Sequence, residues 1–250
     1  LHDLLAVFPA TLELATLALI VGAVLGIVAG VLCARYAGSP WDLAVRTFTL
    51  LGNSVPIFWL GLLMLALFYA RLQWAPGPGR LDDIYQYTVE PRSGFALIDT
   101  WLSGDTAAFK NAIGHLALPV LALVMLQAGS LTRYVRASML DVVKMDFIRT
   151  ARAKGLQERT VILKHALRNA LLPIITLLGF ELPGLFSGAI ITEKVFNWPG
   201  AGHIHIDSLA ARDYPVLMGF TLFLAVLTIV GNLLADVLYA WADPRIRVRS

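Results

Sequence analysis

The sequence predicts an all-α polytopic membrane protein, and three observations support this class. Apolar residues make up 58% of the 250 positions and charged residues only 15%, a balance that is rare for a water-soluble domain of this size. The apolar residues are grouped into long uncharged blocks. Basic residues are concentrated in alternate connectors between these blocks, as expected for helices that cross a bilayer in alternating directions.

Five blocks have the length of a membrane-spanning helix, because a hydrocarbon core of about 30 Å requires about 20 helical residues. One of them, at residues 166–192, contains an acidic residue, Glu181, near its middle. Together they make a single transmembrane domain over residues 1–250. The predicted spans cover about residues 10–34, 47–70, 111–134, 166–192 and 214–240.

The sequence predicts structural roles for several residues within or beside the predicted spans. Small or helix-bending residues, among them Gly22, Gly26 and Gly30, are spaced through the apolar helices, where they permit close helix approach and kinks. Glu181 would be costly in lipid unless it faces water or a partner, by about 2.5–3.5 kcal/mol at mid-span. It can therefore line a substrate pathway or hydrogen-bond a neighbouring helix, and both interpretations stay open. Glu13, at a span end, is expected to be hydrated at the interface.

The distribution of basic residues predicts the topology. With the amino end outside, 14 of the 20 lysines and arginines fall in the inside connectors, so the positive-inside rule places the carboxyl end in the cytoplasm and residues 71–110 in a long outside loop. The net charge of +3 reflects this topology and does not indicate nucleic-acid binding. An odd number of spans leads us to expect one further helix upstream of Leu1.

The cytoplasmic connector at 141–160 contains a short segment with the features of a helix. Asp146 is suited to the N-cap position, where its carboxylate accepts free amide protons. Arg152 and Lys154 lie near the carbonyl end, which attracts cations, and Gly155 suits the left-handed position after the helix.

This helix offers a contact surface. Phe147, Ile148 and Ala151 are apolar, and the small residues keep the helix slim, so it could dock into a groove of another protein. Alternatively, its arginines could rest on lipid headgroups. The spacing alone does not separate these two interpretations.

Two stretches make the sequence recognisable. Arg149–Gly155, followed by His165–Pro173, resembles the EAA-type loop of binding-protein-dependent ABC importers, in the form found in dipeptide, oligopeptide and nickel permeases. Thr150 stands where the general importer pattern has Glu, which also resembles the peptide branch. The resemblance covers nearly the whole chain. Further matching stretches are Ala10–Leu14, Pro56–Trp59, Ala189–Gly200, Arg212–Pro215 and Asp243–Arg247, and residues 94–100 resemble the dipeptide subtype.

The resemblance implies a type I importer transmembrane domain in a bacterial or archaeal cytoplasmic membrane, transporting dipeptides or short oligopeptides. It implies a second homologous permease subunit, two ATP-binding subunits that carry ATP and Mg, and an extracytoplasmic substrate-binding protein. The chain itself would hold no cofactor. The residues expected to couple to the ATPase are Asp146, Phe147, Ile148, Arg149, Thr150, Ala151, Arg152, Ala153, Lys154 and Gly155. Those expected to contact the binding protein are Asn197, Trp198, Pro199, Gly200, Arg212 and Asp213.

Other functions are less well supported by the residues. The sequence has no phosphate-binding Gly-x-x-x-x-Gly-Lys-Ser/Thr loop, so ATP hydrolysis is assigned to other subunits. His203 and His205 lack a nearby acid or thiol cluster in the sequence, and we expect no metal site there. A nickel or glutathione permease of the same family stays an alternative. An ion-coupled secondary transporter, which commonly shows internal repeats and several buried charges, is a second alternative.

Overall fold

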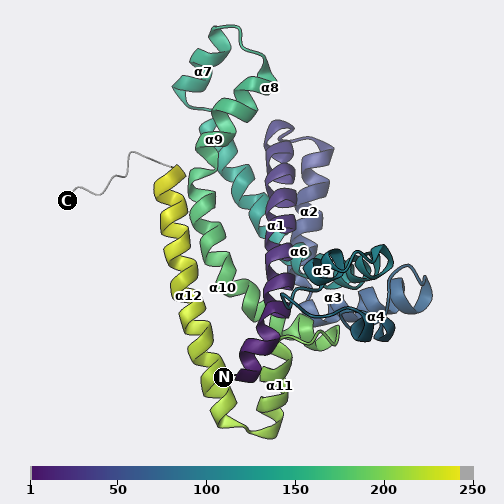
Figure 1. Cartoon of the computed structure of the whole chain (residues 1–250). Helices are drawn as coiled ribbons and strands as arrows, with labels where there is room; N and C mark the ends of the chain where they lie inside the picture. The colour runs from purple at the N-terminus through teal and green to yellow at the C-terminus, as the bar shows by residue number, and fades with distance from the viewer. Residues whose placement is uncertain (1, 243–250) are drawn as a thin grey trace, which may run out of the picture. The chain divides into compact units, whose positions relative to one another are not determined.

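The computed structural model describes residues 2–242, and the regular secondary structure in this range is all helical, without strands (Figure 1). Side chains are described except at positions 2–4, 172, 176, 179–188, 234–236 and 238–242. Two of the segments, η1 and η2, are π-helical. The elements are α1 (His2–Arg35), α2 (Pro40–Ser54), α3 (Ile57–Met64), η1 (Leu65–Arg71), α4 (Asp83–Thr88), α5 (Ala96–Leu102), α6 (Thr106–Val142), α7 (Asp146–Ala153), α8 (Glu158–Thr160), η2 (Val161–Ala166), α9 (Leu167–Ala170), α10 (Leu172–Val195), α11 (Ala201–Ala211) and α12 (Tyr214–Ala242).

The chain forms two compact units, and four long helices, α1, α6, α10 and α12, contribute to both. We describe each unit by itself. Unit 1 comprises residues 1–20, 55–124 and 182–228, and unit 2 comprises residues 21–54, 125–181 and 229–250.

In unit 2, the glycine repeat of α1 packs directly against α6. A Cβ atom on Gly26 would lie 2.8 Å from the Cβ of Leu131, and one on Gly30 would lie 2.6 Å from the Cβ of Val135. A Cβ on Gly22 would collide with the side chain of Gln127. The predicted role of this repeat in close helix approach is therefore confirmed.

The first turn of α2, also in unit 2, is fixed by polar groups. The hydroxyl of Ser39 accepts the Asp42 backbone N–H at 3.2 Å, which is the usual side-chain cap of a helix that begins with proline. The carboxylate of Asp42 is buried and accepts two hydrogen bonds of 2.8 Å from Arg136 of α6. This bidentate ion pair fastens α2 to α6.

The predicted span at 47–70 is not one continuous α-helix. Helix α2 ends at Ser54, Pro56 adopts an extended conformation, and α3 begins at Ile57 before continuing as η1. Pro56 has no N–H to donate to the Gly52 carbonyl, so the helical ladder is interrupted there. In lipid such freed groups require a polar neighbour or water.

The number of spans stays a prediction. Within residues 2–242, three helical stretches are long and apolar enough to cross a membrane, namely Leu5–Arg35, Thr106–Val142 and Tyr214–Leu233. The broken pair α2 and α3–η1 is a fourth candidate if it is counted as one span. The predicted span at 166–192 falls mostly in α10, whose central side chains lie outside the described residues.

Candidate functional site

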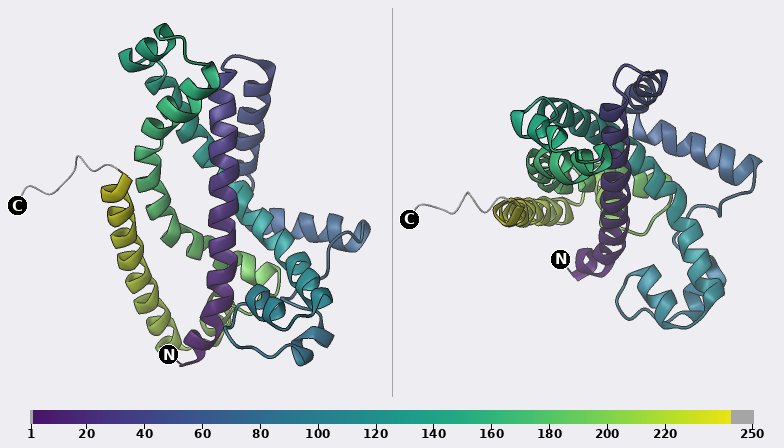
Figure 2. Two further views of the ribbon diagram at one scale, coloured as in Figure 1. Left: turned by 45° about the horizontal axis from the view of Figure 1, so that its top comes forward. Right: turned by 90° about the horizontal axis from the view of Figure 1, so that it is seen from above.

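The segment predicted to contact another protein forms helix α7 in unit 2, followed by a turn and η2. The two further views in Figure 2 show this helix as a short element beyond the end of α6. Gly155 follows it with φ of +74°, and its N–H bonds to the Arg152 carbonyl at 2.9 Å. The predicted left-handed glycine after the helix is therefore confirmed.

The predicted N-cap is displaced by one residue. Helix α7 begins at Asp146, whereas the extended residue before it is Met145, which makes no side-chain cap hydrogen bond. The assignment of Asp146 as the N-cap is therefore wrong, because the chain leaves the turn after α6 with its extended residue at Met145. Asp146 still lies in the first turn, where its negative charge interacts favourably with the helix dipole.

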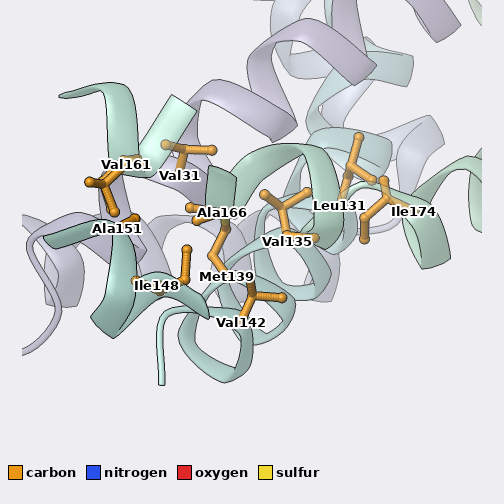
Figure 3. Packing of buried hydrophobic residues seen from close by; sticks show 12 residues of the cluster. Val31, Leu131, Val135, Met139, Val142, Ile148, Ala151, Val161, Ala166 and Ile174 are labelled. Atoms are coloured by element: carbon orange, nitrogen blue, oxygen red, sulfur yellow. The ribbon is translucent and has the colours of Figure 1, made fainter. Parts of the chain in front are cut away.

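One face of α7 is anchored within unit 2. Ile148 is fully buried and Ala151 is nearly so, and both belong to an apolar cluster with residues of α6 and η2, including Met139 and Val161 (Figure 3). The expectation that Ile148 and Ala151 form an outward contact surface is therefore wrong. In an eight-residue helix, which is too short to be stable alone, apolar residues three apart lie on the same face and this face is used for folding.

The opposite face of α7 is available to a partner. Phe147 is 41% exposed, and the side chains of Asp146 and Arg149 are 95% and 74% exposed. Met145 before the helix and Leu156 after it are also exposed. The accessible surface thus combines a few apolar side chains with charges of both signs.

The end of α7 is tied to the segment that follows it. Arg152 donates hydrogen bonds of 3.1 and 2.7 Å to the two carboxylate oxygens of Glu158. The hydrogen bond from Arg152 lowers the pKa of Glu158 below its ordinary value. Both side chains are substantially exposed, so we expect the pair to orient the turn rather than to contribute much stability.

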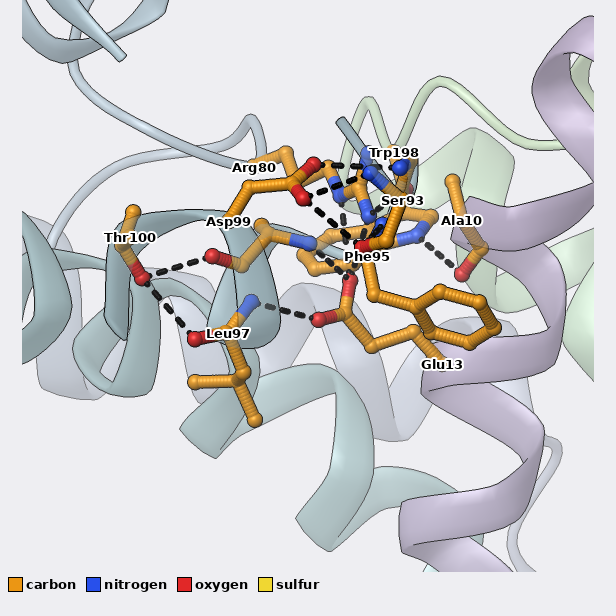
Figure 4. Close-up of polar contacts among 11 residues, drawn as sticks. Ala10, Glu13, Arg80, Ser93, Phe95, Leu97, Asp99, Thr100 and Trp198 are labelled. Atoms are coloured by element: carbon orange, nitrogen blue, oxygen red, sulfur yellow. Dashed lines mark hydrogen bonds and ion pairs between the residues drawn. The ribbon is translucent and has the colours of Figure 1, made fainter. Parts of the chain in front are cut away.

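A second polar site lies in unit 1 around Glu13 of α1 (Figure 4). Its carboxylate is 3% exposed and pairs with Arg80. It also accepts the backbone N–H groups of Ala96 and Leu97, at 3.1 and 2.7 Å, at the start of α5. Arg80 donates in turn to the Gly94 carbonyl at 2.6 Å. The expectation of a hydrated interfacial Glu13 is wrong, because this carboxylate organises the long loop.

Trp198 joins this site from a distant part of the sequence. It is fully buried, and its indole N–H donates to the Ala10 carbonyl of α1 at 2.9 Å. The guanidinium of Arg80 lies 5.8 Å from the ring centroid of Trp198, a distance at which a cation–π interaction is favourable. The Glu13–Arg80–Trp198 cluster therefore connects α1, the long loop and the segment after α10.

The residues predicted to contact a binding protein divide into two groups. Trp198 and Gly200 are buried and cannot present a surface. The exposed members are Asn197, Pro199, Arg212 and Asp213. Asn197 and Arg212 both have left-handed backbone conformations, with φ of 49° and 57°, which place each at a sharp turn.

A cavity of about 240 Å³ adjoins this exposed group within unit 1. Arg80, Gln86 and Asp99 contribute polar groups to its lining, and Pro199 lies at its edge. Asp99 accepts hydrogen bonds from the Ser93 hydroxyl and backbone N–H, both at 2.7 Å. Burial opposes ionisation of Asp99, but these hydrogen bonds outweigh it and lower its pKa.

The remaining predicted residues lead to no site. His203 lies 3.3 Å from a carboxylate oxygen of Asp207, and His205 stacks on Phe220. Among the described residues, no group of three metal-ligating side chains is close enough to hold a metal. The side chain of Glu181 and all of the Asp243–Arg247 stretch lie outside the described residues.

Comparison with known sequences gives a consistent result. Residues 26–248 match the family described as binding-protein-dependent transport system inner membrane component. The di/tripeptide transport system permease protein of Pseudomonas aeruginosa is 45% identical over 246 residues, which cover 98% of this chain and 73% of that protein. The dipeptide transport system permease protein of Escherichia coli is 44% identical, with 96% and 71% covered. An oligopeptide transport system permease protein of Bacillus subtilis is 40% identical, with 97% and 71% covered.

Solved structures share the fold at low sequence identity. A chain from an inward-facing methionine ABC transporter has a TM-score of 0.68 and 17% identity, with 96% of each chain covered. A chain from an amino acid ABC transporter has a TM-score of 0.57 and 15% identity, with 98% of this chain and 94% of that chain covered. The aligned regions cover nearly the whole chain, so the similarity concerns the fold of the whole domain.

Proposed function

This chain belongs to the family of binding-protein-dependent transport system inner membrane components, and on that premise we propose that it forms part of the translocation pore of an importer for dipeptides and short oligopeptides. The observation that carries this proposal is the 45% identity to a di/tripeptide permease over 98% of the chain. Family and fold confirm the predicted class, an all-α importer transmembrane domain of type I. The chain is the permease component, and ATP hydrolysis belongs to partner subunits.

The exposed face of α7 is the proposed contact with an ATP-binding subunit. The exposed charged side chains of Asp146 and Arg149 and the partly exposed Phe147 suit a groove that is lined by apolar and charged groups. Anchorage of Ile148 in the apolar cluster supports this proposal, because a helix that transmits motion must be fixed rigidly to the domain it moves. Residues 146–155 would then move together with the ATP-binding subunits when two such subunits close on each other.

On the other side of the membrane, the exposed residues Asn197, Pro199, Arg212 and Asp213 are the proposed contact with a substrate-binding protein. The Glu13–Arg80–Trp198 cluster supports this assignment, because it fixes the loop beside Pro199 to α1. Trp198 and Gly200 would act only by holding this surface in place.

The remaining partners follow from the same proposal. A second homologous permease subunit would complete the pore, and ATP with Mg would bind to two partner subunits. The chain would cross the cytoplasmic membrane of a bacterium or archaeon several times with its carboxyl end in the cytoplasm, as the excess of basic residues in the inside connectors supports. Glu181 is proposed to face the pathway, because a mid-span acid is stable only beside water or a polar partner.

The proposal is tested by uptake. Cells that lack the complete transporter, and cells in which it is restored, are given labelled dipeptides, oligopeptides, nickel and glutathione. We expect restored uptake of dipeptides, together with ATP hydrolysis that peptide and binding protein stimulate. Restoration of nickel or glutathione uptake alone would contradict the peptide assignment. Peptide uptake that continued without an ATP-binding subunit would indicate an ion-coupled transporter instead.

A further inference from the structure

A polar cluster in unit 2 has no role in the functions described above. It comprises Asn53 in the last turn of α2 and Ser130 and Arg133 of α6. In the amide orientation that satisfies its neighbours, Asn53 donates to the Leu126 carbonyl at 2.9 Å. The Asn53 oxygen then accepts from both terminal nitrogens of Arg133, at 3.0 and 3.1 Å, and from the Ser130 hydroxyl at 3.3 Å.

Arg133 differs from its neighbour Arg136, one turn further along α6. The guanidinium of Arg136 is neutralised by the buried carboxylate of Asp42 through two hydrogen bonds of 2.8 Å. Arg133 has only neutral acceptors, and among the described residues no carboxylate lies within ion-pair distance of it. The exposed Arg133 is therefore a cation that no carboxylate of the described residues compensates.

The Arg133 side chain is directed toward the uncharged part of α6. Residues 111–132 carry no charge, and side chains of an α-helix lean toward its amino end, so the guanidinium lies over the preceding turn, where it contacts the Ser130 hydroxyl at 3.3 Å. Asn53, which also holds it, lies six residues inside the uncharged run of α2 that starts at Thr47. An uncompensated cation held toward apolar segments is favoured where water or an anion reaches it.

The backbone is shaped to bring these groups together. A Cβ on Gly129 would lie 3.1 Å from the side-chain amide group of Asn53 and 3.3 Å from the Thr49 carbonyl, so α2 and α6 are in close contact at this position. Leu126 and Tyr134, on either side of the cluster, are exposed. The cluster is thus a rigid, accessible patch with one positive charge and neutral hydrogen-bonding groups beside it.

From this arrangement we propose that Arg133, positioned by Asn53 and Ser130, binds the terminal carboxylate of a peptide during its passage through the membrane. A guanidinium offers a planar fork of N–H donors that matches a carboxylate. The inference rests on the proposed function, because it assumes a peptide cargo. Asn53 and Ser130 act here as positioning residues.

The first experiment measures water access and charge without any cargo. Ser130→Cys is made in a Cys33→Ala background, which removes the single, buried natural cysteine, and the complete transporter is placed in proteoliposomes. Anionic and cationic methanethiosulfonates are compared after normalisation to a free thiol. We expect the anionic reagent to react faster by on the order of tenfold, and Arg133→Gln to abolish this preference. The matched control is Arg46→Gln, which changes another exposed arginine in unit 2 and should leave the preference intact.

The second experiment measures dipeptide uptake by the same proteoliposomes, prepared with and without phosphatidylglycerol. Arg133→Gln should lower uptake about tenfold, which is typical for loss of a charge-assisted hydrogen bond, and Arg133→Lys, which keeps the charge but loses the planar fork, should lower it less. We expect both results in either lipid. Slow labelling of Ser130→Cys by both reagents, or unchanged uptake by Arg133→Gln, would overturn the proposal. An effect of Arg133→Gln confined to anionic vesicles would identify a lipid headgroup as the anion and also overturn it. If wild-type transporter took up no peptide while the charge preference persisted, the proposed function would have failed separately.

Discussion

Replacement of Ile148 by alanine should release helix α7 from the rest of the domain. Ile148 is fully buried in the cluster that contains Met139, Val142 and Val161. These four residues lie between the predicted spans 111–134 and 166–192, on the segment expected outside the bilayer, so the energetics of burial from water apply to Ile148. Ile→Ala substitutions at such positions cost about 2–5 kcal/mol. Since α7 has only eight residues, it has little stability of its own to offset this loss.

The assay is amide hydrogen exchange of the peptide that covers α7, in the purified transporter. A loss of 2 kcal/mol corresponds to an opening equilibrium about 30-fold more favourable, so the α7 amides should exchange about 30-fold faster or more. Arg149→Ala is the matched control, because this side chain is 74% exposed and packs against nothing that the cluster requires. It should leave exchange unchanged while weakening peptide-stimulated ATP hydrolysis. Exchange at the wild-type rate in Ile148→Ala would refute the assigned anchorage.

Three further predictions concern other parts of the chain. Glu13→Gln removes the charge that compensates the largely buried Arg80 and should lower the free energy of unfolding by about 3–5 kcal/mol. The control Glu90→Gln, at an exposed site, should change the free energy of unfolding little. Equal thermal stability of the two variants would contradict this prediction. Gly30→Ala places a Cβ 2.6 Å from the Cβ of Val135 and should destabilise the folded protein by about 1–3 kcal/mol. The control Gly52→Ala should not, because the nearest atom that its Cβ would meet, in Met125, lies 3.9 Å away. Unfolding of both variants at the same temperature would exclude overpacking at Gly30. The folded-state pKa of Asp99 is lowered, so the contribution of Asp99 to stability is complete above its ordinary pKa of 3.8 and is lost as the pH falls through the folded value. Protease cleavage of the loop 71–110 should therefore increase only in that acidic range. An increase near pH 6 would contradict the stabilising role of the Asp99 carboxylate.

The features that the sequence predicted well are those set by local rules. Uncharged runs identify apolar helices because lipid cannot satisfy backbone polar groups. Gly22, Gly26 and Gly30 indicate close helix contact because small residues let two helix backbones approach each other. Gly155 is recognisable because a left-handed residue after a helix favours glycine.

The features that the sequence did not predict depend on distant contacts. Glu13 and Arg80 are 67 positions apart, and nothing in the local pattern of either residue indicates the pairing. The burial of Ile148 also depends on η2, which follows in the chain. Two missed features are local, the start of α7 after Met145 and the break at Pro56. A proline can break a helix, but Pro119 lies within the continuous helix α6, so the residue type alone does not predict the break.

The central claim is that the outer face of α7 contacts an ATP-binding subunit, and site-specific crosslinking tests it most directly. Single cysteines are introduced by Phe147→Cys and Arg149→Cys in the Cys33→Ala background. The control is Tyr87→Cys, in the loop 71–110 that is expected outside, where Tyr87 is 90% exposed and thus more accessible than either α7 residue. A short bifunctional thiol–amine reagent is then applied to the assembled transporter in membranes. We predict that both α7 variants form a crosslink to the ATP-binding subunit and that Tyr87→Cys forms none. Absence of this product from both α7 variants, in a complex that still hydrolyses ATP in response to peptide, would contradict the assignment.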